Sequence, residues 1–437
     1  MTNFIKIIIF FLFFISNFSY AQKINIVRDA EIENFLYELS RPLLENIKID
    51  ATNLKFYIDR QKYINAFVTT GPRIFLTTEL LTKTNNINQV VGVIAHELGH
   101  VTGGHLNKRA NAYNNSFITS VLSSILAVGA IAAGAGDAGN AIILGGQHIG
   151  NRQLLSFSRN QESFADQAAI KLLKSSGYSV NGMYELFKIL EKKERISSFN
   201  PYSLTHPLSR ERKRIVEFHL ENDRNHNKNY KLEKKFKLLQ AKLNGFLASN
   251  ESLERLYTEN NDEKWYAYAI RYHMNGNKIK ALSLIDQCIK SDKQNPYFYE
   301  TKGQIYYENG DAVNAIANFE KALNIKNNEK HFYLALAKAL YLSDNQKNYS
   351  ISINLLKNYI KLEDFPIEAW HFLALCYGKL QKYSLSSLAL TEKFLLLNDL
   401  KNAKLQLKRA EKMNNDDDEI NSLILDLKFL IKQKESK

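Results

Sequence analysis

Residues 91–105 read VGVIAHELGHVTGGH, and this stretch decides how the first half of the chain is expected to fold. Apolar residues precede His96, and the four-residue spacing of His96 and His100 suits an α-helix. Residues four apart share one helix face, so both imidazoles can bind a single Zn²⁺. Glu97 lies beside them, where its carboxylate can take a proton from a water molecule. The stretch therefore predicts a helix that supplies half of a zinc site.

A catalytic zinc site needs a third protein ligand and keeps its fourth position for water. His105 is not expected to be that ligand, because on a continued helix it would point about 180° away from His96. We expect His105 to lie at the surface or to contact a ligand from outside the metal shell. On this interpretation His105→Ala leaves metal binding unchanged.

A better third ligand lies in SRNQESFADQAAIKLL, residues 158–173. Glu162 and Asp166 are four residues apart on an expected helix with apolar neighbours, where carboxylates need partners such as a metal ion. Glu162 would complete a site of two histidines and one glutamate. Asp166 could hydrogen-bond a ligand imidazole or help to protonate the leaving amine. The alternative is an ordinary solvated helix face.

The chain begins MTNFIKIIIFFLFFISNFSYAQ, which is typical of an export signal. One lysine precedes an apolar run at 7–15, and the small residues Ser19 and Ala21 fit a signal-peptidase site after Ala21. The run is short for a membrane span. We expect a cleaved signal peptide at 1–21 and a periplasmic mature protein, with an uncleaved anchor as the alternative.

The composition is that of a folded protein: 437 residues are 45% hydrophobic, enough for two or three domains. The formal net charge is +13, but even the densest stretch, 210–242, mixes eleven Lys/Arg with five Asp/Glu. Lysine and asparagine are common throughout, so the charge indicates a compositional bias and a solvated helix. We expect no nucleic-acid partner, while anionic lipid headgroups stay open as a weak one.

From about residue 256 the chain repeats with a period of 34 residues, which is typical of paired helices. Large aromatic residues recur at the same place, and a small residue follows each of them four positions later. The pairs are Trp265 and Ala269, Tyr299 and Gly303, Tyr333 and Ala337, and Trp370 and Ala374. The pattern resembles the tetratricopeptide family, with about three extra residues in the third repeat and a total of four or five repeats.

The two cysteines, Cys288 and Cys376, fall three repeats apart in this register. Repeats contact mainly their neighbours, and a disulfide needs Cα atoms within about 7 Å. Both cysteines are therefore expected to be small core residues rather than a disulfide.

Four stretches occur in an order that resembles metallopeptidase family forty-eight. They are NAFVTTGPRIFLTTELL at 65–81, AHELGHVTGGH at 95–105, SRNQESFADQAA at 158–169 and THPLSRER at 205–212. The resemblance covers nearly the whole mature chain. It implies one Zn²⁺ per chain and a strand within 65–75 that presents its edge to substrate, consistent with β-augmentation.

The resemblance also implies a role for each site residue. The zinc ligands would be His96, His100 and Glu162, with Glu97 as general base and Asp166 as assisting acid. His206 matches a histidine on a loop that can occupy the open zinc position and hold the enzyme off. Arg212 matches a family arginine near the site, whose role is left open.

An apolar segment at 117–135 carries no charge over nineteen residues, which is long enough to be a membrane-span candidate. A single crossing would put His96 and Glu162 on opposite sides of the membrane and destroy the zinc site. A hairpin returning through 141–149 would avoid this, as in membrane-embedded relatives of the family. We favour a membrane-facing helical lid with peripheral membrane contact.

The expected fold is mainly α: an α+β zincin-type metalloprotease domain followed by an α-solenoid of tetratricopeptide repeats. The expected boundaries are 1–21 for the signal peptide, 22–225 for the protease domain, 226–255 for a linking helix and 256–437 for the repeats.

The expected function is a zinc endopeptidase of the cell envelope that performs quality control on unfolded or misassembled proteins. The resemblance implies outer-membrane β-barrel precursors as substrates, an assisting role in their assembly, and the barrel-assembly machinery docking on the repeats. Two alternatives stay open. One is a chaperone or scaffold acting through its repeats, and the other is an integral inner-membrane quality-control protease.

Overall fold

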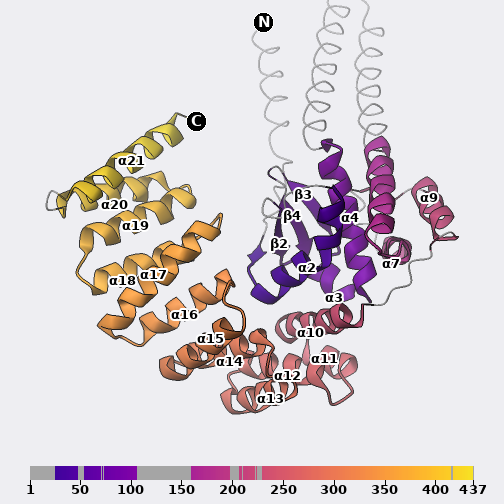
Figure 1. Cartoon of the computed structure of the whole chain (residues 1–437), viewed down its shortest axis with the longest axis horizontal. Coiled ribbons are helices and arrows are strands. Elements are labelled where there is room, and N and C mark those ends of the chain that lie inside the picture. Colours follow the sequence, from indigo (N-terminus) through magenta and orange to yellow (C-terminus); the bar gives the residue numbers. More distant parts are fainter. Residues whose placement is uncertain are drawn as a thin grey trace, which may run out of the picture. The chain divides into compact units, whose positions relative to one another are not determined.

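The computed structural model describes residues 25–47, 54–69, 71, 73–105, 159–196, 206–208, 210–221, 223, 229–414 and 417–436. The expected signal peptide and the apolar 117–135 segment lie outside these residues. The chain divides into two compact units, shown by their elements in Figure 1. Unit 1 comprises Met1–Arg28 and Ser40–Asn227, and unit 2 comprises Asp29–Leu39 and Lys228–Lys437. Helix α2 (Ala30–Ile47) contributes a part to each unit.

Unit 1 contains a four-stranded sheet in the order β1-β2-β4-β3. The strands are β1 (Ile26–Val27), β2 (Lys55–Asp59), β3 (Ala66–Thr69) and β4 (Arg73–Thr77). Strand β2 pairs in parallel with β4, while the pairs β1 with β2 and β3 with β4 are antiparallel. Strand β3 therefore lies at one edge of the sheet, within the stretch expected to present an edge to substrate.

Aromatic residues in register connect strands β2, β4 and β3 of this sheet. Tyr57 on β2 faces Phe75 on β4, which faces Phe67 on β3. The rings stack with centroids 5.1 and 4.8 Å apart. Such cross-strand aromatic pairs add to the stability of a sheet beyond the area that they bury.

The described helices of unit 1 are the second half of α2, α3 (Thr78–Lys83), α4 (Ile87–Thr102), a helical stretch at 159–175, α7 (Asn181–Ile196) and α9 (Arg210–Glu221). Among them, α4 is nearly buried and packs against α7 and β3. Asn86 caps α4, because its side chain accepts a hydrogen bond from the Gln89 backbone N–H. A Cβ on Gly92 would come within 2.9 Å of the Met183 side chain, so this glycine lets α4 pack closely against α7.

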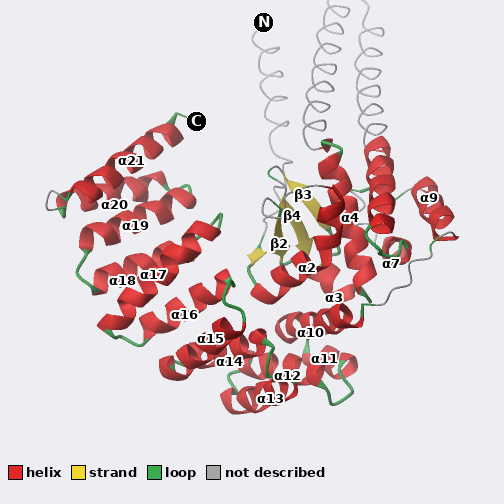
Figure 2. Ribbon diagram, viewed as in Figure 1, coloured by secondary structure: helices red, strands yellow, loops and turns green. Residues whose placement is uncertain are grey.

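Unit 2 is helical from residue 229 onward, as the red ribbons of Figure 2 show. Where one linking helix was expected within 226–255, the structure has α10 (Tyr230–Leu247) and most of α11 (Asn250–Leu256). The remaining helices are α12 (Asp262–Met274), α13 (Lys278–Ser291), α14 (Pro296–Glu308), α15 (Ala312–Ile325), α16 (Lys330–Leu342), α17 (Gln346–Leu362), α18 (Ile367–Lys379), α19 (Tyr383–Leu396), α20 (Leu400–Lys412) and α21 (Asp418–Glu435).

The helices of unit 2 confirm the predicted repeat solenoid. Trp265 and Tyr299 are each the fourth residue of a first helix, α12 and α14, and Tyr333 and Trp370 hold the same place in α16 and α18. Each first helix packs against the helix that follows it, which gives four pairs from α12 to α19 in the described part of the chain. Helix α17 has 17 residues where α13 and α15 have 14, which accounts for the three extra residues of the third repeat.

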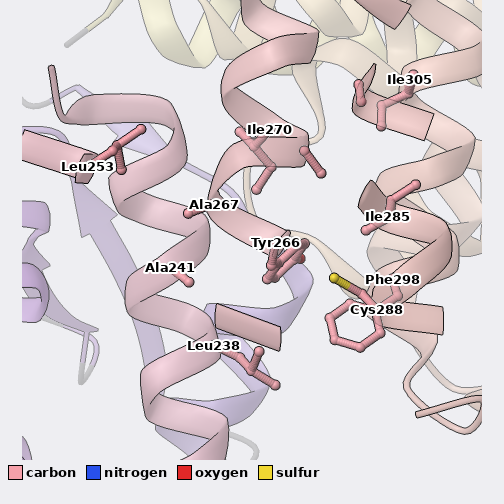
Figure 3. Close-up of a cluster of buried hydrophobic side chains, with 12 residues drawn as sticks. Leu238, Ala241, Leu253, Tyr266, Ala267, Ile270, Ile285, Cys288, Phe298 and Ile305 are labelled. Carbon is pink, nitrogen blue, oxygen red and sulfur yellow. The ribbon is translucent and has the colours of Figure 1, made fainter. Parts of the chain in front are cut away.

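The first repeats share a core that contains one of the two cysteines. Figure 3 shows Cys288 among the buried side chains of α10 to α14, including Tyr266 and Phe298. Cys376 belongs to a separate core cluster farther along the array. Both thiols are free and buried, which confirms the expectation of small core residues.

Among the helices that the structure describes, none combines the length and the apolar character needed to cross a membrane.

Candidate metal centre

A glycine in the middle of the metal-binding motif brings two helices into contact. A Cβ built on Gly99 would lie 2.7 Å from the carbonyl oxygen of Ala165 on the 159–175 helix. Only glycine leaves room for this approach. Glu162 and Asp166, on the same helix as Ala165, therefore face His96 and His100 of α4 at hydrogen-bonding distance.

Four buried side chains direct their ligand atoms at one point. His96, His100, Glu162 and His206 each offer one atom, and these atoms lie within 4.8 Å of one another. His96 Nε2 lies 3.1 Å from His100 Nε2 and 3.3 Å from Glu162 Oε2. His100 Nε2 lies 3.3 Å from Glu162 Oε1.

These spacings can be tested against the geometry of a metal ion. Ligands about 2.0–2.1 Å from a tetrahedral Zn²⁺ lie about 3.3–3.4 Å from one another. The observed distances of 3.1–3.3 Å between ligand atoms agree with that value. The donor set of three imidazoles and one carboxylate also suits zinc. The residues present therefore fit a divalent metal ion.

His206 takes the fourth corner of this cluster. Its Nδ1 atom lies 3.1 Å from Glu162 Oε2 and 3.3 Å from His96 Nε2. Its other ring nitrogen, Nε2, lies 3.4 Å from Glu97 Oε1. His206 is 3% exposed, so the ring is enclosed with the other three ligand residues.

Glu97 is fully buried at the edge of the cluster. Within the described ranges, neither of its carboxylate oxygens accepts a hydrogen bond. A buried carboxylate without donors is costly unless a missing group such as water, substrate or an ion completes its surroundings. This carboxylate is therefore free to accept a proton from a molecule at the cluster.

Asp166 and Arg212 support the cluster from outside. Arg212 on α9 donates two hydrogen bonds to Asp166, from Nε to Oδ2 at 2.6 Å and from Nη2 to Oδ1 at 2.9 Å. The third guanidinium nitrogen, Nη1, lies 3.0 Å from Glu162 Oε2. Asp166 Oδ1 in turn lies 2.9 Å from His96 Nδ1. Of the two roles expected for Asp166, this geometry favours the orientation of a ligand imidazole.

The charged and polar neighbours of Glu162 and Asp166 keep both carboxylates ionised. Burial opposes ionisation of Glu162, but hydrogen bonds from His100, His206 and His96 hold its pKa below the usual range. Burial also opposes ionisation of Asp166, and Arg212 outweighs it and lowers that pKa. Burial disfavours the charged form of His96, yet hydrogen bonds to Asp166 and Glu162 raise its pKa to about 9. These values describe the metal-free cluster, in which protons take the place of a cation.

All seven residues named from the sequence, and His105 as well, lie in or against this cluster. His105 is not among the four converging residues, and it is buried against His100 rather than exposed. Sequence analysis missed two features. Gly99 was not singled out, although a glycine between two metal-binding histidines signals a close helix contact. The pairing of Arg212 with Asp166 spans 46 residues and had no local signal.

Comparisons with known proteins agree with this geometry. The model of Peptidase family M48 matches residues 28–217. The beta-barrel assembly-enhancing protease of Yersinia pestis is 26% identical over 364 residues, which is 80% of this chain and 73% of that protein. The protein of the same name from Escherichia coli K12 is 30% identical over 191 residues, and the match spans 43% of this chain and only 38% of that relative.

Among solved structures, a double mutant of MamA covers 41% of this chain and 99% of its own, at 15% identity and a TM-score of 0.32. The solenoid assignment rests on the helix pairs of unit 2 rather than on that likeness. The match to the Yersinia pestis protein is long enough to include parts of both units. Over residues 28–217 the chain therefore carries a metalloendopeptidase domain that resembles peptidase family M48.

Proposed function

We propose that this chain is a zinc-dependent endopeptidase of the bacterial cell envelope, exported to the periplasm and cleaved after Ala21. The observation that carries the proposal is the convergence of four buried ligand atoms, those of His96, His100 and Glu162 at the spacing of a tetrahedral site, beside the carboxylate of Glu97, which accepts no hydrogen bond among the described residues. In a purely structural cluster, a buried carboxylate that accepts no hydrogen bond would only lower the stability.

His96, His100 and Glu162 would hold the ion, with one Zn²⁺ per chain. A bound Zn²⁺ supplies Lewis acidity, which polarises a carbonyl oxygen and makes a water molecule more acidic. Glu97 then acts as general base: it takes a proton from the attacking water and delivers it to the amide nitrogen that leaves. Asp166 and Arg212 keep His96 and Glu162 in place during these steps.

Substrate would bind as an added strand on β3. This strand pairs with β4 on one side, and no strand of the described sheet pairs with its other side. An extended peptide can add to such an edge through main-chain hydrogen bonds. Only an unfolded or locally unfolded protein offers its backbone in this way, which favours misfolded proteins as substrates.

The names of the relatives suggest which misfolded proteins these are. The matched proteins of Yersinia pestis and Escherichia coli are called beta-barrel assembly-enhancing proteases. We propose that this chain degrades misfolded or stalled outer-membrane β-barrel proteins and assists their assembly. The repeats would dock on the barrel-assembly machinery, and the 117–135 segment would touch the membrane surface.

His206 would regulate the site. With its Nδ1 at the fourth corner, the ring takes the place that water needs, so this arrangement is a closed state. A partner or substrate on the repeats would favour a state in which His206 has moved away.

The test uses the purified full chain and an unfolded outer-membrane β-barrel precursor as reporter. We expect about one zinc per chain by elemental analysis and cleavage of the reporter. Glu97→Gln should keep zinc and fold but lose about 10²- to 10⁴-fold in rate, because the amide cannot accept the proton. Cleavage by Glu97→Gln near the wild-type rate would contradict the proposal.

The same variant separates the enzyme from its rivals. If Glu97→Gln restores barrel assembly in cells that lack the protein, the chain acts as a chaperone or scaffold. Alkaline extraction of membranes distinguishes the third candidate, because an integral membrane protease stays in the pellet.

A further inference from the structure

The chain reverses immediately after α4, and two glycines make the reversal. Gly103 follows the last helical residue, Thr102, and its N–H still donates to the Gly99 carbonyl at 3.0 Å. Gly104 then adopts a φ of +62°, in the left-handed region that glycine reaches without strain. The next residue, His105, is thereby turned back toward the helix that has just ended.

This turn brings His105 onto the outer face of His100. The two Nδ1 atoms lie 2.9 Å apart, and the rings meet edge to face with centroids 5.0 Å apart. On a continued helix, residues five apart point about 140° away from each other and could not make this contact. His105 is 6% exposed, so the hydrogen bond is shielded from solvent.

Gly103 is needed for a second reason, which is space. A Cβ on Gly103 would lie 2.3 Å from His105 Nε2 and 2.7 Å from its Cδ2. Any other residue at this position would have to displace the imidazole. The sequence Gly103-Gly104-His105 therefore combines one glycine that leaves room for the ring with one that turns the chain.

The helix that carries Glu162 holds His105 from its other side. Gln161 Nε2 donates to the His105 carbonyl at 3.3 Å. The ring of Phe164, half-exposed, lies edge-on to the imidazole with centroids 5.2 Å apart. His105 is thus fixed between the two helices that supply the metal ligands.

The direction of the hydrogen bond follows from the ligand role of His100. Its Nε2 faces the other ligand atoms, 3.1 Å from His96 Nε2, so this nitrogen must present its lone pair to an ion. The proton of the neutral ring then lies on Nδ1 and is donated to His105 Nδ1. His96, the other ligand histidine of α4, also has a hydrogen-bonding partner at its Nδ1 atom, which lies 2.9 Å from Asp166 Oδ1.

We propose that His105 is the positioning residue of His100: it accepts the Nδ1 hydrogen bond, fixes the ring and tautomer of that ligand, and depends on Gly103 and Gly104 for its place. The inference rests on the proposed metal role of the cluster. It replaces the sequence-based expectation that His105→Ala binds metal normally. Outer partners of this kind change metal affinity by about 10- to 100-fold when they are lost.

The experiment measures zinc affinity of the full chain by competition with a chelator of known affinity, independently of any proteolysis. His105→Asn places an oxygen where Nδ1 lies, since both atoms are bonded to Cγ, and it should bind zinc within about threefold of wild type. His105→Leu keeps bulk without an acceptor and should bind about 10- to 100-fold more weakly. Gly103→Ala should resemble His105→Leu, because its methyl group displaces the ring.

Gly177→Ala is the matched control. Gly177 has a left-handed φ of +76°, like Gly104 and unlike Gly103 with its φ of −72°, and a Cβ there meets nothing within 4 Å, so this variant adds a methyl group and backbone strain without displacing a ring. We expect wild-type zinc affinity for it. The circular dichroism and melting temperature of every variant are measured alongside.

Equal affinities of wild type and His105→Leu would overturn the proposal. So would a His105→Asn chain that folds normally yet binds as weakly as His105→Leu, because bulk rather than the acceptor would then matter. A wild-type chain without measurable zinc affinity would instead overturn the metal site itself, and the two failures are distinguishable.

Discussion

The two units of this chain each gather three carboxylates and one strong cation in a cluster, and they differ in how the excess negative charge is compensated. In unit 1 the group is Glu97, Glu162 and Asp166 with Arg212. In unit 2 it is Asp29, Glu31 and Glu300 with Lys242, whose Nζ lies 2.7 Å from Asp29 and 3.5 Å from each glutamate. The acidic groups outnumber the cation by two in both places.

In unit 2 protonation of carboxylates reduces the excess negative charge. Burial raises the pKa of Glu31 to about 7, and it raises the pKa of Glu300 as well. The Tyr266 hydroxyl donates a hydrogen bond to Glu31 Oε2 at 2.8 Å. Burial works against the charge of Lys242, yet the carboxylates around it, Asp29 first, raise its pKa well above the ordinary value. This cluster joins the first half of α2 to the repeats, and one of its carboxylate oxygens, Glu300 Oε2, has no hydrogen-bond partner among the described residues.

In unit 1 Glu162 and Asp166 stay ionised instead. Imidazoles and a guanidinium surround Glu162 and Asp166 and lower their pKa values despite burial. Three ring nitrogens and a carboxylate then converge, while Glu97 accepts no hydrogen bond among the described residues. A buried acidic cluster alone is thus no sign of a metal site. What distinguishes the site is the presence of neutral lone-pair donors beside carboxylates held in the charged form.

The largest effect should come from removing the carboxylate ligand. Glu162→Ala leaves two imidazoles and should reduce zinc content from about one per chain to a small fraction, with loss of cleavage. Glu300→Gln, a change in the matching position of the other cluster, should leave zinc content at the wild-type level. Elemental analysis after dialysis checks both. Retention of zinc by Glu162→Ala would remove the distinction between the two clusters.

The second effect concerns folding rather than metal. Lys242→Met leaves three carboxylates around a buried apolar side chain and should lower the free energy of unfolding by about 3 kcal/mol or more. Lys235→Met is the control, because Lys235 pairs with Glu38 at the surface and such pairs contribute little. Urea denaturation measures both. A Lys242→Met chain as stable as Lys235→Met would show that the buried pair contributes nothing.

The sequence predicted those parts of this comparison that depend on local spacing. The histidines of α4 and the carboxylates of the 159–175 helix were found because a four-residue spacing marks one helix face. The solenoid was found because Trp265, Tyr299 and Tyr333 repeat every 34 residues. Both signals are fixed spacings along the sequence, so they can be recognised without knowledge of the tertiary structure.

Long-range pairing was beyond sequence analysis. The Tyr266 hydroxyl bonds Glu31 across 235 residues, and nothing near either residue indicates the other. The same holds for Arg212, whose partners Glu162 and Asp166 lie about fifty residues upstream. The contact of His105 with His100 agrees with one of the two places expected for it, outside the metal shell, but the turn at Gly103 and Gly104 that makes this contact was not predicted.

The third effect is a pH dependence confined to unit 2. The pKa of Glu31 is about 7 in the folded chain against 4.5 as its ordinary value, so folding favours the protonated form. The stability from this group is complete below pH 4.5 and is lost as pH rises to about 7. The loss amounts to about 3 kcal/mol.

Glu31→Gln tests this by mimicking the protonated acid. Its free energy of unfolding in urea should match wild type near pH 4.5 and exceed it by up to about 3 kcal/mol at pH 8. Because the comparison is made at each pH, the titration of other groups cancels. A constant difference between the two chains at all pH values would contradict the protonation of Glu31.

The fourth effect separates two roles of Asp166. If it orients His96, Asp166→Asn should weaken zinc affinity by about 10- to 100-fold. If it is the assisting acid, affinity should stay constant while turnover at saturating zinc falls. Asp223→Asn is the control, since Asp223 accepts hydrogen bonds from Ser179 and Val180 in the same unit. Chelator competition and reporter cleavage on both variants give the answer.

The smallest expected effect is a gain, and it concerns His206. In unit 2 the removal of Lys242 leaves its carboxylates without the cation that they contact, but in unit 1 the His206 imidazole can be removed while three ligand residues remain. His96, His100 and Glu162 suffice for an ion, and His206 Nδ1 occupies the corner that water would need.

His206→Ala should therefore keep zinc and raise basal cleavage of an unfolded reporter by about five- to tenfold, the lower end of typical allosteric coupling. If His206 instead stabilises the oxyanion of the reaction, the same variant should lose turnover with zinc retained. The sign of the change in one assay on zinc-replete protein decides between a latch and a catalytic group. The 3.4 Å approach of His206 Nε2 to Glu97 favours the latch, because a ring in that place blocks the general base as well as the open corner.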